Sequence, residues 1–345
     1  MSLTPKEFQS KLRIIAKGKH GSKDLLRAEA FEILYTIFTE EISPVMVGSF
    51  LTAMRFKGAN EEELSGFLDA VEKSSVAIDW KIDGLLNVNG PYDGRSSSLN
   101  LSVAASLVAA SAGVPVLLHS AFDMTPKRGV TSGEIMEELG IPSMLSLDSV
   151  FKQLKKYNIS FLHNSKFMTG MGKLRLLREQ LLFRTVLHTL EVINNPARAP
   201  YSIIGLAHDY FCEKFARVQA SRGVRHVVAI PGLDGADEAP MKKVMAYEVR
   251  EGAGSALELD PARFGFSYSE KRNAESVATT AKITEAILAG EKGESLDSVV
   301  YNAGLRIYIG GKAKNLSDAI QAARELIESG KVMEKLNSMR VRDFL

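Results

Sequence analysis

The sequence predicts an α/β protein with a small all-α domain ahead of a larger, mostly parallel α/β domain. With 345 residues the chain is long enough for two domains. The first 75 residues show only helical spacing of apolar side chains, whereas later ones alternate short apolar runs with helical stretches. Such alternation is typical of a parallel sheet covered by helices. Hydrophobic residues at 45% and charged residues at 24% exclude wholesale disorder.

Four helices are expected in the N-terminal block. Thr4, Pro5 and Glu7 form a capping-box start for the first, and the second carries an apolar face from Leu26 to Phe38. Ser43–Pro44 begins the third, and Asn60 with Glu63 caps the fourth. In the C-terminal part another helix is expected, with Ser317 as its cap and Gly330 at its end.

Short apolar runs after this block predict strands. They lie at 85–88, 114–118, 159–162, 201–206 and 226–230, and further candidates lie at 243–249 and 256–259.

The composition also indicates the cellular compartment. The single cysteine, Cys212, cannot form an internal disulfide, so a reducing compartment is expected. We expect no secretory signal, because the N-terminal residues are charged and lack an apolar run. The longest uncharged stretch, 96–118, contains Gly113 and Pro115, which argues against a membrane span. A cytoplasmic protein without a membrane role is the prediction.

Charge is unevenly distributed although the net charge is only +2. Residues 151–225 hold 13 Lys or Arg against 4 acids, a net +9, which leaves −7 for the rest of the chain. This asymmetry suggests an anionic partner. Solvated surface charge explains it about equally well.

The segment GLDGADE, residues 232–238, follows the apolar run HVVAIP. A glycine-rich turn after a strand places Asp237 and Glu238 at the carboxyl edge of the sheet, where α/β proteins bind ligands. Adjacent carboxylates suit Mg²⁺, which prefers oxygen and bridges to phosphates. An ordinary acidic turn has the same pattern.

The segment GPYDGRSSSLNLS, residues 90–102, precedes a predicted helix and suits a phosphate. Backbone amides, hydroxyls and the positive end of the helix dipole attract anions, and Arg95 adds a bidentate donor. A capped polar loop is the alternative. A further stretch after residue 117 contains His119, Lys127 and Arg128, although a lone His at a strand end is more often structural. The candidate phosphate or substrate ligands are Asp93, Gly94, Arg95, Ser96, Ser97, Asn100, Ser102, His119, Lys127 and Arg128.

Nearly the whole chain resembles the anthranilate phosphoribosyltransferase family. The segments that carry the resemblance are VGSFLTAMRFKGANEEELSGFLDAV, NLSVAASLVAASAGVPV, GEIMEELGI, LREQLLFRTVLHTLEVINNPA, GLDGADE and VREGAGSALELDPARFGF. The resemblance implies a nucleoside phosphorylase/phosphoribosyltransferase-like fold. It implies a helical dimerisation domain at 1–75 with hinge helices from about 168–193 packing on it, and an α/β domain at 76–345. It also implies Mg²⁺ at Asp237 and Glu238, a homodimer, and Arg178 at the anthranilate-binding position.

The departures from the family fall in the substrate loops. The family's GTGGDG loop reads NGPYDG here, which keeps Asp93 and Gly94 but puts Pro91 and Tyr92 where glycines stand. Proline lacks an amide donor, and a tyrosine side chain crowds the phosphate. Leu118 stands at the lysine of the family's KHGNR loop, and Val103 replaces a hydroxyl. These changes imply weak or absent anthranilate phosphoribosyltransferase activity.

The departures resemble a sister branch of TrpD-like proteins, which shares GKHGSKDL-, PYDGRS- and TPKRGV-like stretches. For part of that branch the implied role is sequence-nonspecific nucleic-acid binding by a dimer. The residues expected to contact nucleic acid are Lys17, Lys19, Lys23, Lys155, Lys156, Lys173 and Arg175.

Two function classes therefore stay open. In the first, the chain binds a phosphorylated anionic ligand with Mg²⁺ at the hinge cleft, as a phosphoribosyltransferase-like protein with Arg178, Asp237 and Glu238 as catalytic residues. In the second, the same cleft and the dimer groove bind nucleic acid, single-stranded in our expectation, or a phosphorylated metabolite, without catalysis. The retained acidic pair favours the first class, and the lost glycines and lysine favour the second.

Overall fold

The computed structural model describes residues 2–18, 20–268 and 273–340 and divides them into two compact units. The first unit contains residues up to 78 together with 164–196, and the second contains 79–163 together with the residues from 197 onward. No helix in the described part of the chain is long and apolar enough to cross a membrane.

The described residues of the first unit form helices joined by loops, without a strand. The first, third and fourth N-terminal helices start where the sequence predicts, with full capping boxes at Thr4–Glu7 and Asn60–Glu63. Phe50 packs edge-on against Phe8 and Phe67, which ties three of these helices together. The helices of this unit are α1 (Pro5–Ile15), α2 (Arg27–Thr39), α3 (Pro44–Lys57), α4 (Glu61–Lys73), α8 (Thr169–Gly172), α9 (Arg175–Leu181) and α10 (Val186–Val192).

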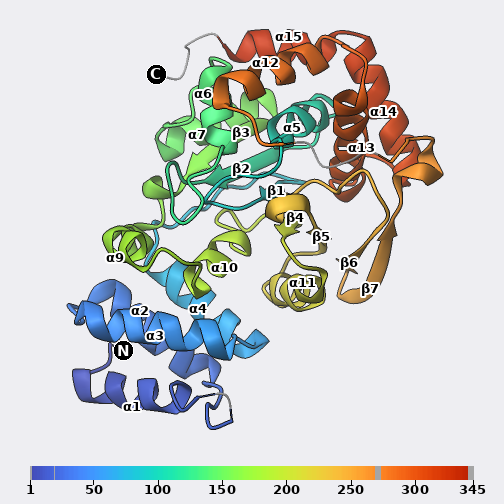
Figure 1. Ribbon diagram of the computed structural model, residues 1–345. Coiled ribbons are helices and arrows are strands. Elements are labelled where there is room, and N and C mark those ends of the chain that lie inside the picture. The colour runs from blue at the N-terminus through green and yellow to red at the C-terminus, as the bar shows by residue number, and fades with distance from the viewer. Residues whose placement is uncertain (1, 19, 269–272, 341–345) are drawn as a thin grey trace. The chain divides into compact units, whose positions relative to one another are not determined.

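The second unit is built on a seven-stranded sheet in the order β3-β2-β1-β4-β5-β6-β7 (Figure 1). The first five strands in this order are parallel, and β6 and β7 extend the sheet as antiparallel strands. The strands are β1 (Leu86–Asn89), β2 (Val116–Ser120), β3 (Ile159–His163), β4 (Tyr201–Leu206), β5 (His226–Pro231), β6 (Val244–Arg250) and β7 (Ala253–Leu259). This architecture confirms the predicted fold class.

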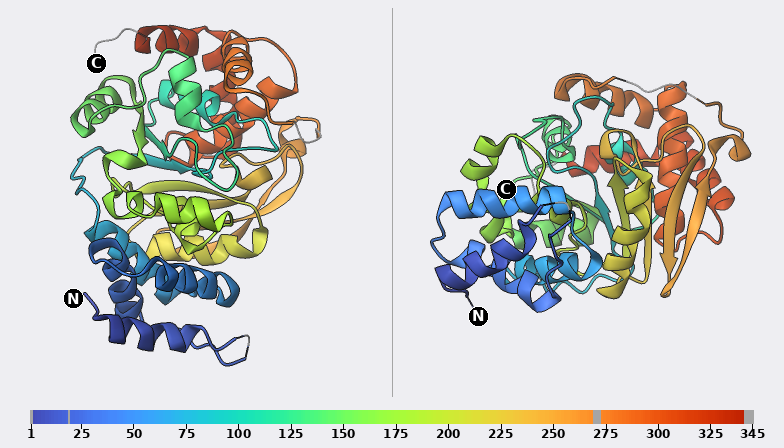
Figure 2. Two further views of the ribbon diagram at one scale, coloured as in Figure 1. Left: turned by 60° about the vertical axis from the view of Figure 1, so that its left-hand side comes forward. Right: turned by 60° about the horizontal axis from the view of Figure 1, so that its bottom comes forward.

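Helices cover both faces of this sheet. The α5 and α13 helices pack together over one face, whereas α11 lies on the other (Figures 1 and 2). The helices of this unit are α5 (Ser102–Ser111), α6 (Ser132–Glu138), α7 (Leu147–Tyr157), α11 (Cys212–Ser221), α12 (Val277–Leu288), α13 (Glu294–Ile309), α14 (Leu316–Glu328) and α15 (Lys331–Met339). The predicted cap, Ser317, is wrong by two residues. The cap is Asn315, whose Oδ1 accepts a hydrogen bond from the amide of Asp318.

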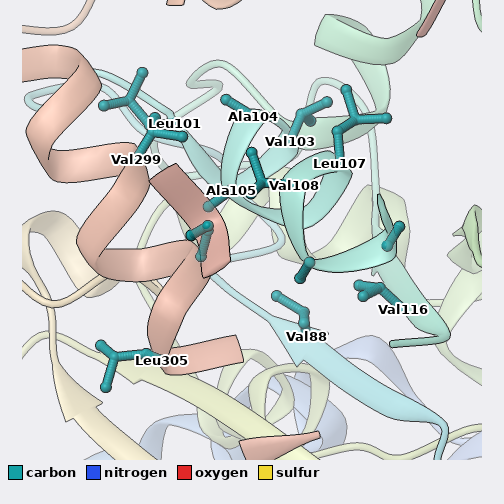
Figure 3. Packing of buried hydrophobic residues seen from close by; sticks show 14 of the residues in the cluster. Val88, Leu101, Val103, Ala104, Ala105, Leu107, Val108, Val116, Val299 and Leu305 are labelled. Atoms are coloured by element: carbon teal, nitrogen blue, oxygen red, sulfur yellow. The ribbon is translucent and has the colours of Figure 1, made fainter. Parts of the chain in front are cut away.

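The core of the second unit forms around α5. This helix is buried on all sides because its residues are small or branched and apolar, so it packs against the sheet and against α13 at once. Val103, Val108, Val88 and Val299 point into this cluster (Figure 3). The buried helix fixes the position of the loop that precedes it.

Candidate functional site

The candidate site lies at the carboxyl edge of the parallel strands in the second unit. Loops that follow β1, β2 and β5 come together there, as expected for α/β proteins. An isolated antiparallel bridge between Arg95 and Val130 joins the first two loops. Gly94 has φ +72°, and a Cβ on it would lie 2.1 Å from the carbonyl oxygen of Gly129. This close approach requires glycine.

The backbone amides predicted to bind phosphate are taken by a side chain of the protein itself. Oδ2 of Asp234 accepts hydrogen bonds from the amides of Ser96 at 2.8 Å and Ser97 at 3.1 Å. Lys127 lies beside it, with its Nζ 2.5 Å from Oδ1 of Asp234 and 2.8 Å from the carbonyl oxygen of Asp234. Burial opposes ionisation of Asp234, but Lys127 and the two amides outweigh it and lower its pKa.

The acidic pair Asp237 and Glu238 contacts two buried arginines. Nη2 of Arg95 lies 3.1 Å from Oδ1 of Asp237 and also bonds Oε2 of Glu238. Nη2 of Arg306, from α13, lies 2.5 Å from Oδ2 of Asp237. Burial opposes ionisation of Asp237, yet the charges of Arg306 and Arg95 leave its pKa lowered. Burial raises the pKa of Glu238, and Arg95 offsets this only in part.

The start of α5 is bound to the same pair. Ser102 donates its hydroxyl to Oδ2 of Asp237 at 2.5 Å, and its own amide donates to Oδ1 of Asn100 at 3.1 Å. The side-chain amide of Asn100 in turn donates to the carbonyl oxygen of Val130 at 3.1 Å. Ser102 and Asn100, both predicted as phosphate ligands, therefore connect the loop before α5 to the loops that follow β5 and β2.

Tyr92, in the loop that follows β1, has a buried side chain. It is 1% exposed, and its hydroxyl hydrogen-bonds to Nδ1 of His119. Nε2 of His119 lies 2.8 Å from Oδ1 of Asn87, which can only accept, so the imidazole carries its proton on Nε2 and accepts the tyrosine hydroxyl at Nδ1. Burial lowers the pKa of His119 to about 3. The ring is neutral and both its nitrogens are hydrogen-bonded. His119 therefore fits the role of a structural histidine at a strand end and not that of a phosphate ligand.

Two small cavities lie beside Arg95 at this edge. A cavity of about 20 Å³ lies between the loop and β2, which is room for about one water molecule. Its lining includes Pro91, Arg95, Asn100, Ser102, His119 and Asp237. A second cavity of about 60 Å³ lies on the other side of Arg95, against Glu238 and Met241.

The structure thus brings most of the predicted site residues to one edge, but others lie elsewhere. Arg128 belongs to the loop after β2, but its side chain is exposed and pairs with Asp123 at 2.6 Å. Arg178 belongs to the first unit, where it forms a bidentate pair with Glu191 at 2.6 and 2.7 Å. Its guanidinium is therefore engaged in holding α9 to α10.

The predicted nucleic-acid contacts do not form one cluster within a unit. Lys17, Lys23, Lys173 and Arg175 belong to the first unit, whereas Lys155 and Lys156 lie on α7 in the second. Nζ of Lys173 donates to the carbonyl oxygen of Phe38, and Arg175 pairs with Glu179. Lys19 lies outside the described residues.

Sequence reasoning missed Arg306 and Asp234. Arg306 is an arginine within the apolar run AGLRIYI, and a fully buried arginine requires an acidic partner, so this position carried a readable signal. Asp234 gave no comparable signal, because its role depends on a left-handed backbone conformation with φ 59°.

The side chains do not fit Mg²⁺ in this arrangement. Asp237 and Glu238 are balanced by the two guanidinium groups. Within the described ranges 2–18, 20–268 and 273–340, no group of three or more His, Cys, Asp or Glu could hold a metal ion, so Mg²⁺ here would need further ligands from water or phosphate. The predicted Mg²⁺ ligands are therefore ion-pair partners here.

Comparisons with known proteins agree with the fold. The model of the glycosyl transferase family a/b domain matches residues 93–333, and that of the family's helical bundle domain matches residues 12–75. An anthranilate phosphoribosyltransferase of Pelotomaculum thermopropionicum is 31% identical over 96% of this chain and 95% of its own length. One of Brevibacillus brevis is 30% identical over 95% and 96%.

Solved structures are similar over the same extent. Anthranilate phosphoribosyltransferase (TrpD) from Thermus thermophilus has a TM-score of 0.83 at 26% identity, covering 96% of this chain and 98% of that one. The Saccharomyces cerevisiae enzyme in complex with PRPP and Mg has a TM-score of 0.81 at 20% identity and 97% coverage of both chains. At 20% identity, the similarity to the Saccharomyces cerevisiae enzyme shows a shared fold and no more.

Proposed function

This chain belongs to the glycosyl transferase family that includes the anthranilate phosphoribosyltransferases, and we propose that it is a binding member that has lost phosphoribosyl transfer to anthranilate. On this proposal it belongs to the TrpD-like branch with rewritten substrate loops. Its ligand is single-stranded nucleic acid, bound without sequence preference by a homodimer.

Protein side chains occupy the carboxyl edge of the sheet, and this observation supports the proposed loss of phosphoribosyl transfer. A phosphoribosyl pyrophosphate needs amide donors for its pyrophosphate and space for its ribose. The amides of Ser96 and Ser97 bind Asp234, and the Tyr92 ring is buried where the family has glycines. The two cavities beside Arg95, of about 20 and 60 Å³, are each far too small for such a ligand. Binding on a surface needs no rearrangement of this edge.

A coupled assay for phosphoribosyl anthranilate tests the loss of transfer. Loss of one oxyanion-type donor costs about 3 kcal/mol of transition-state stabilisation, or roughly 10²-fold or more in rate, and several donors are missing here. We expect a rate at least that far below the rate of a family enzyme measured in parallel. Ordinary turnover would refute the proposal.

The basic face of α7 favours a polyanion. Lys152, Lys155 and Lys156 are all exposed, and the first two have no acidic partner within ion-pair distance among the described residues. The half-buried rings of Trp80 and Phe151 lie beside this face with centroids 5.9 Å apart. Exposed lysines next to aromatic rings are the elements that bind single strands.

Fluorescence anisotropy with a labelled oligonucleotide tests this ligand. Charge reversal at Lys152 and Lys155 should weaken binding for all sequences and reduce the salt slope by about 0.7 for each phosphate that is no longer neutralised. Reversal of the exposed Lys314 and Lys331 changes the net charge equally and serves as the matched control. Absent binding at low salt, or an equal effect of the control, would exclude α7 as the binding face.

The retained residues favour a second candidate, a small phosphorylated ligand at the sheet edge. Asp93, Gly94, Ser102 and the acidic pair match the family positions. Binding would require Asp234 and Tyr92 to leave their present positions. Saturable binding of phosphoribosyl pyrophosphate that the Lys152 and Lys155 reversal leaves unchanged would support this candidate.

A further inference from the structure

Asp237, Glu238, Arg95 and Arg306 form one buried ionic cluster in the second unit. Their exposed fractions are 2%, 6%, 3% and 0%. Two carboxylates face two guanidinium groups, so opposite charges are present in equal number. A buried charge is stable only when it is paired and hydrogen-bonded, and this cluster meets that condition without an added ion.

Both guanidinium groups are fixed in place by bonds outside the acidic pair. Nη1 of Arg95 donates to the carbonyl oxygen of Leu99 at 3.0 Å, and Nη1 of Arg306 donates to that of Asn302 at 3.1 Å. Arg95 is held further by the backbone bridge to Val130. The arginines are thus built into the loop and into α13, and they are not mobile surface side chains.

The carboxylate oxygens offer little to a cation. Both oxygens of Asp237 and one of Glu238 accept hydrogen bonds from Arg95, Arg306 or Ser102. The remaining oxygen, Oε1 of Glu238, is buried without a hydrogen-bond partner among the described residues. With one free carboxylate oxygen, Mg²⁺ would have to take its other ligands from water or phosphate, and its two added positive charges would leave the cluster unbalanced.

We propose that the guanidinium groups of Arg95 and Arg306 replace the divalent cations at this acidic pair, so that the pair is a metal-independent structural clamp. The clamp joins the loop before α5, the turn after β5 and helix α13. It does not depend on the proposed function, because it would hold whether the ligand is nucleic acid or a small phosphate.

The sign of a stability change separates the clamp from a vacant metal site. In a vacant site two neighbouring carboxylates repel each other, so Asp237→Asn with Glu238→Gln raises the melting temperature in EDTA. In the clamp the same double change leaves two buried guanidinium groups without counter-charges and lowers it, by roughly 5 °C or more. Glu40→Gln with Glu41→Gln alters two exposed neighbouring acids and is the matched control. A rise for the Asp237 and Glu238 variant would overturn the proposal.

Mn²⁺, detected by electron paramagnetic resonance, provides a second readout on the full chain. We expect the wild type to bind no Mn²⁺ at millimolar concentration, alone or with phosphoribosyl pyrophosphate, and its melting temperature to stay unchanged. Arg95→Leu removes the guanidinium that contacts both acids, so Mn²⁺ should raise the lowered melting temperature of this variant. Mn²⁺ binding to the wild type that Asp237→Asn with Glu238→Gln abolishes would refute the clamp, even if Arg95→Leu does not fold.

Discussion

Tyr92 donates its hydroxyl hydrogen to Nδ1 of His119, and this bond joins the loop that follows β1 to strand β2. The two rings meet edge to face with centroids 5.5 Å apart. Because Nε2 of His119 donates to Asn87, protonation of the ring would require Tyr92 to give up its donor role. The pair thus keeps the imidazole neutral.

Stability should fall with acid because of His119. Its pKa is lowered to about 3 in the folded chain by burial, whereas an unfolded histidine titrates near 6.5. Between these values only the unfolded state binds the proton, so the free energy of unfolding decreases as pH falls, by up to about 1.4 kcal/mol per pH unit. Urea unfolding from pH 7 to pH 4 measures this slope.

The variant His119→Gln removes the titrating ring, so its stability should depend less on pH than that of the wild type. His208→Gln, at an exposed histidine, is the control and should keep the wild-type slope. Parallel slopes for wild type and His119→Gln would show that the ring is not neutral in the folded state.

Asp234→Ala should create an affinity for inorganic pyrophosphate. The change frees the amides of Ser96 and Ser97 and removes the carboxylate that pairs with Lys127, so the loop gains donors and a positive charge that suit a phosphate group. Calorimetry should detect binding to this variant and none to the wild type. The exposed Asp83→Ala is the control. If Asp234→Ala binds pyrophosphate no better than Asp83→Ala does, the loop is not a latent phosphate site.

Glu63 should be a main stabilising residue of the helical unit. Its buried carboxylate accepts the amides of Leu25 and Asn60 and lies 2.7 Å from Nζ of Lys57. Glu63→Ala leaves these donors without their acceptor, which should cost about 3 kcal/mol of unfolding free energy. The exposed neighbour Glu62→Ala should change it by less than about 0.5 kcal/mol. Circular dichroism in urea compares the two, and equal effects would contradict this role.

The proposed homodimer should depend on the surface of α3. Val45 and Phe56 are 76% and 87% exposed, and they line a cavity of about 1080 Å³ between α1 and α3. Exposed apolar surface of this kind marks interaction sites. Light scattering should give a dimer for the wild type at micromolar concentration and a monomer for Phe56→Glu. A monomeric wild type would exclude the dimer.

The fold could be predicted because its signals are local. Capping boxes at Thr4 and Asn60 fix helix starts, and the short apolar runs fix the order of the strands along the chain. The place of Asp237 and Glu238 at the carboxyl edge of the sheet followed from the rule that ligand loops follow parallel strands.

The partners of the site residues could not be predicted in the same way. Arg95 suits a phosphate in the sequence, but in the structure its side chain is buried and pairs with Asp237 and Glu238. Asp234 lies 138 positions from its partner Ser96 along the chain. Arg306 lies 204 positions from Ser102, and contacts over such separations leave no periodic pattern. Charge pairing between distant segments therefore decides which groups the site residues bind.

The most direct test of the filled edge is calorimetric titration of the wild type with phosphoribosyl pyrophosphate in the presence of Mg²⁺. We predict no saturable heat up to millimolar ligand, because Asp234 binds the amides of Ser96 and Ser97, and Arg95 and Arg306 pair with the acids. A family enzyme titrated in parallel shows that the ligand is intact. Saturable micromolar binding that requires Mg²⁺ would contradict the account.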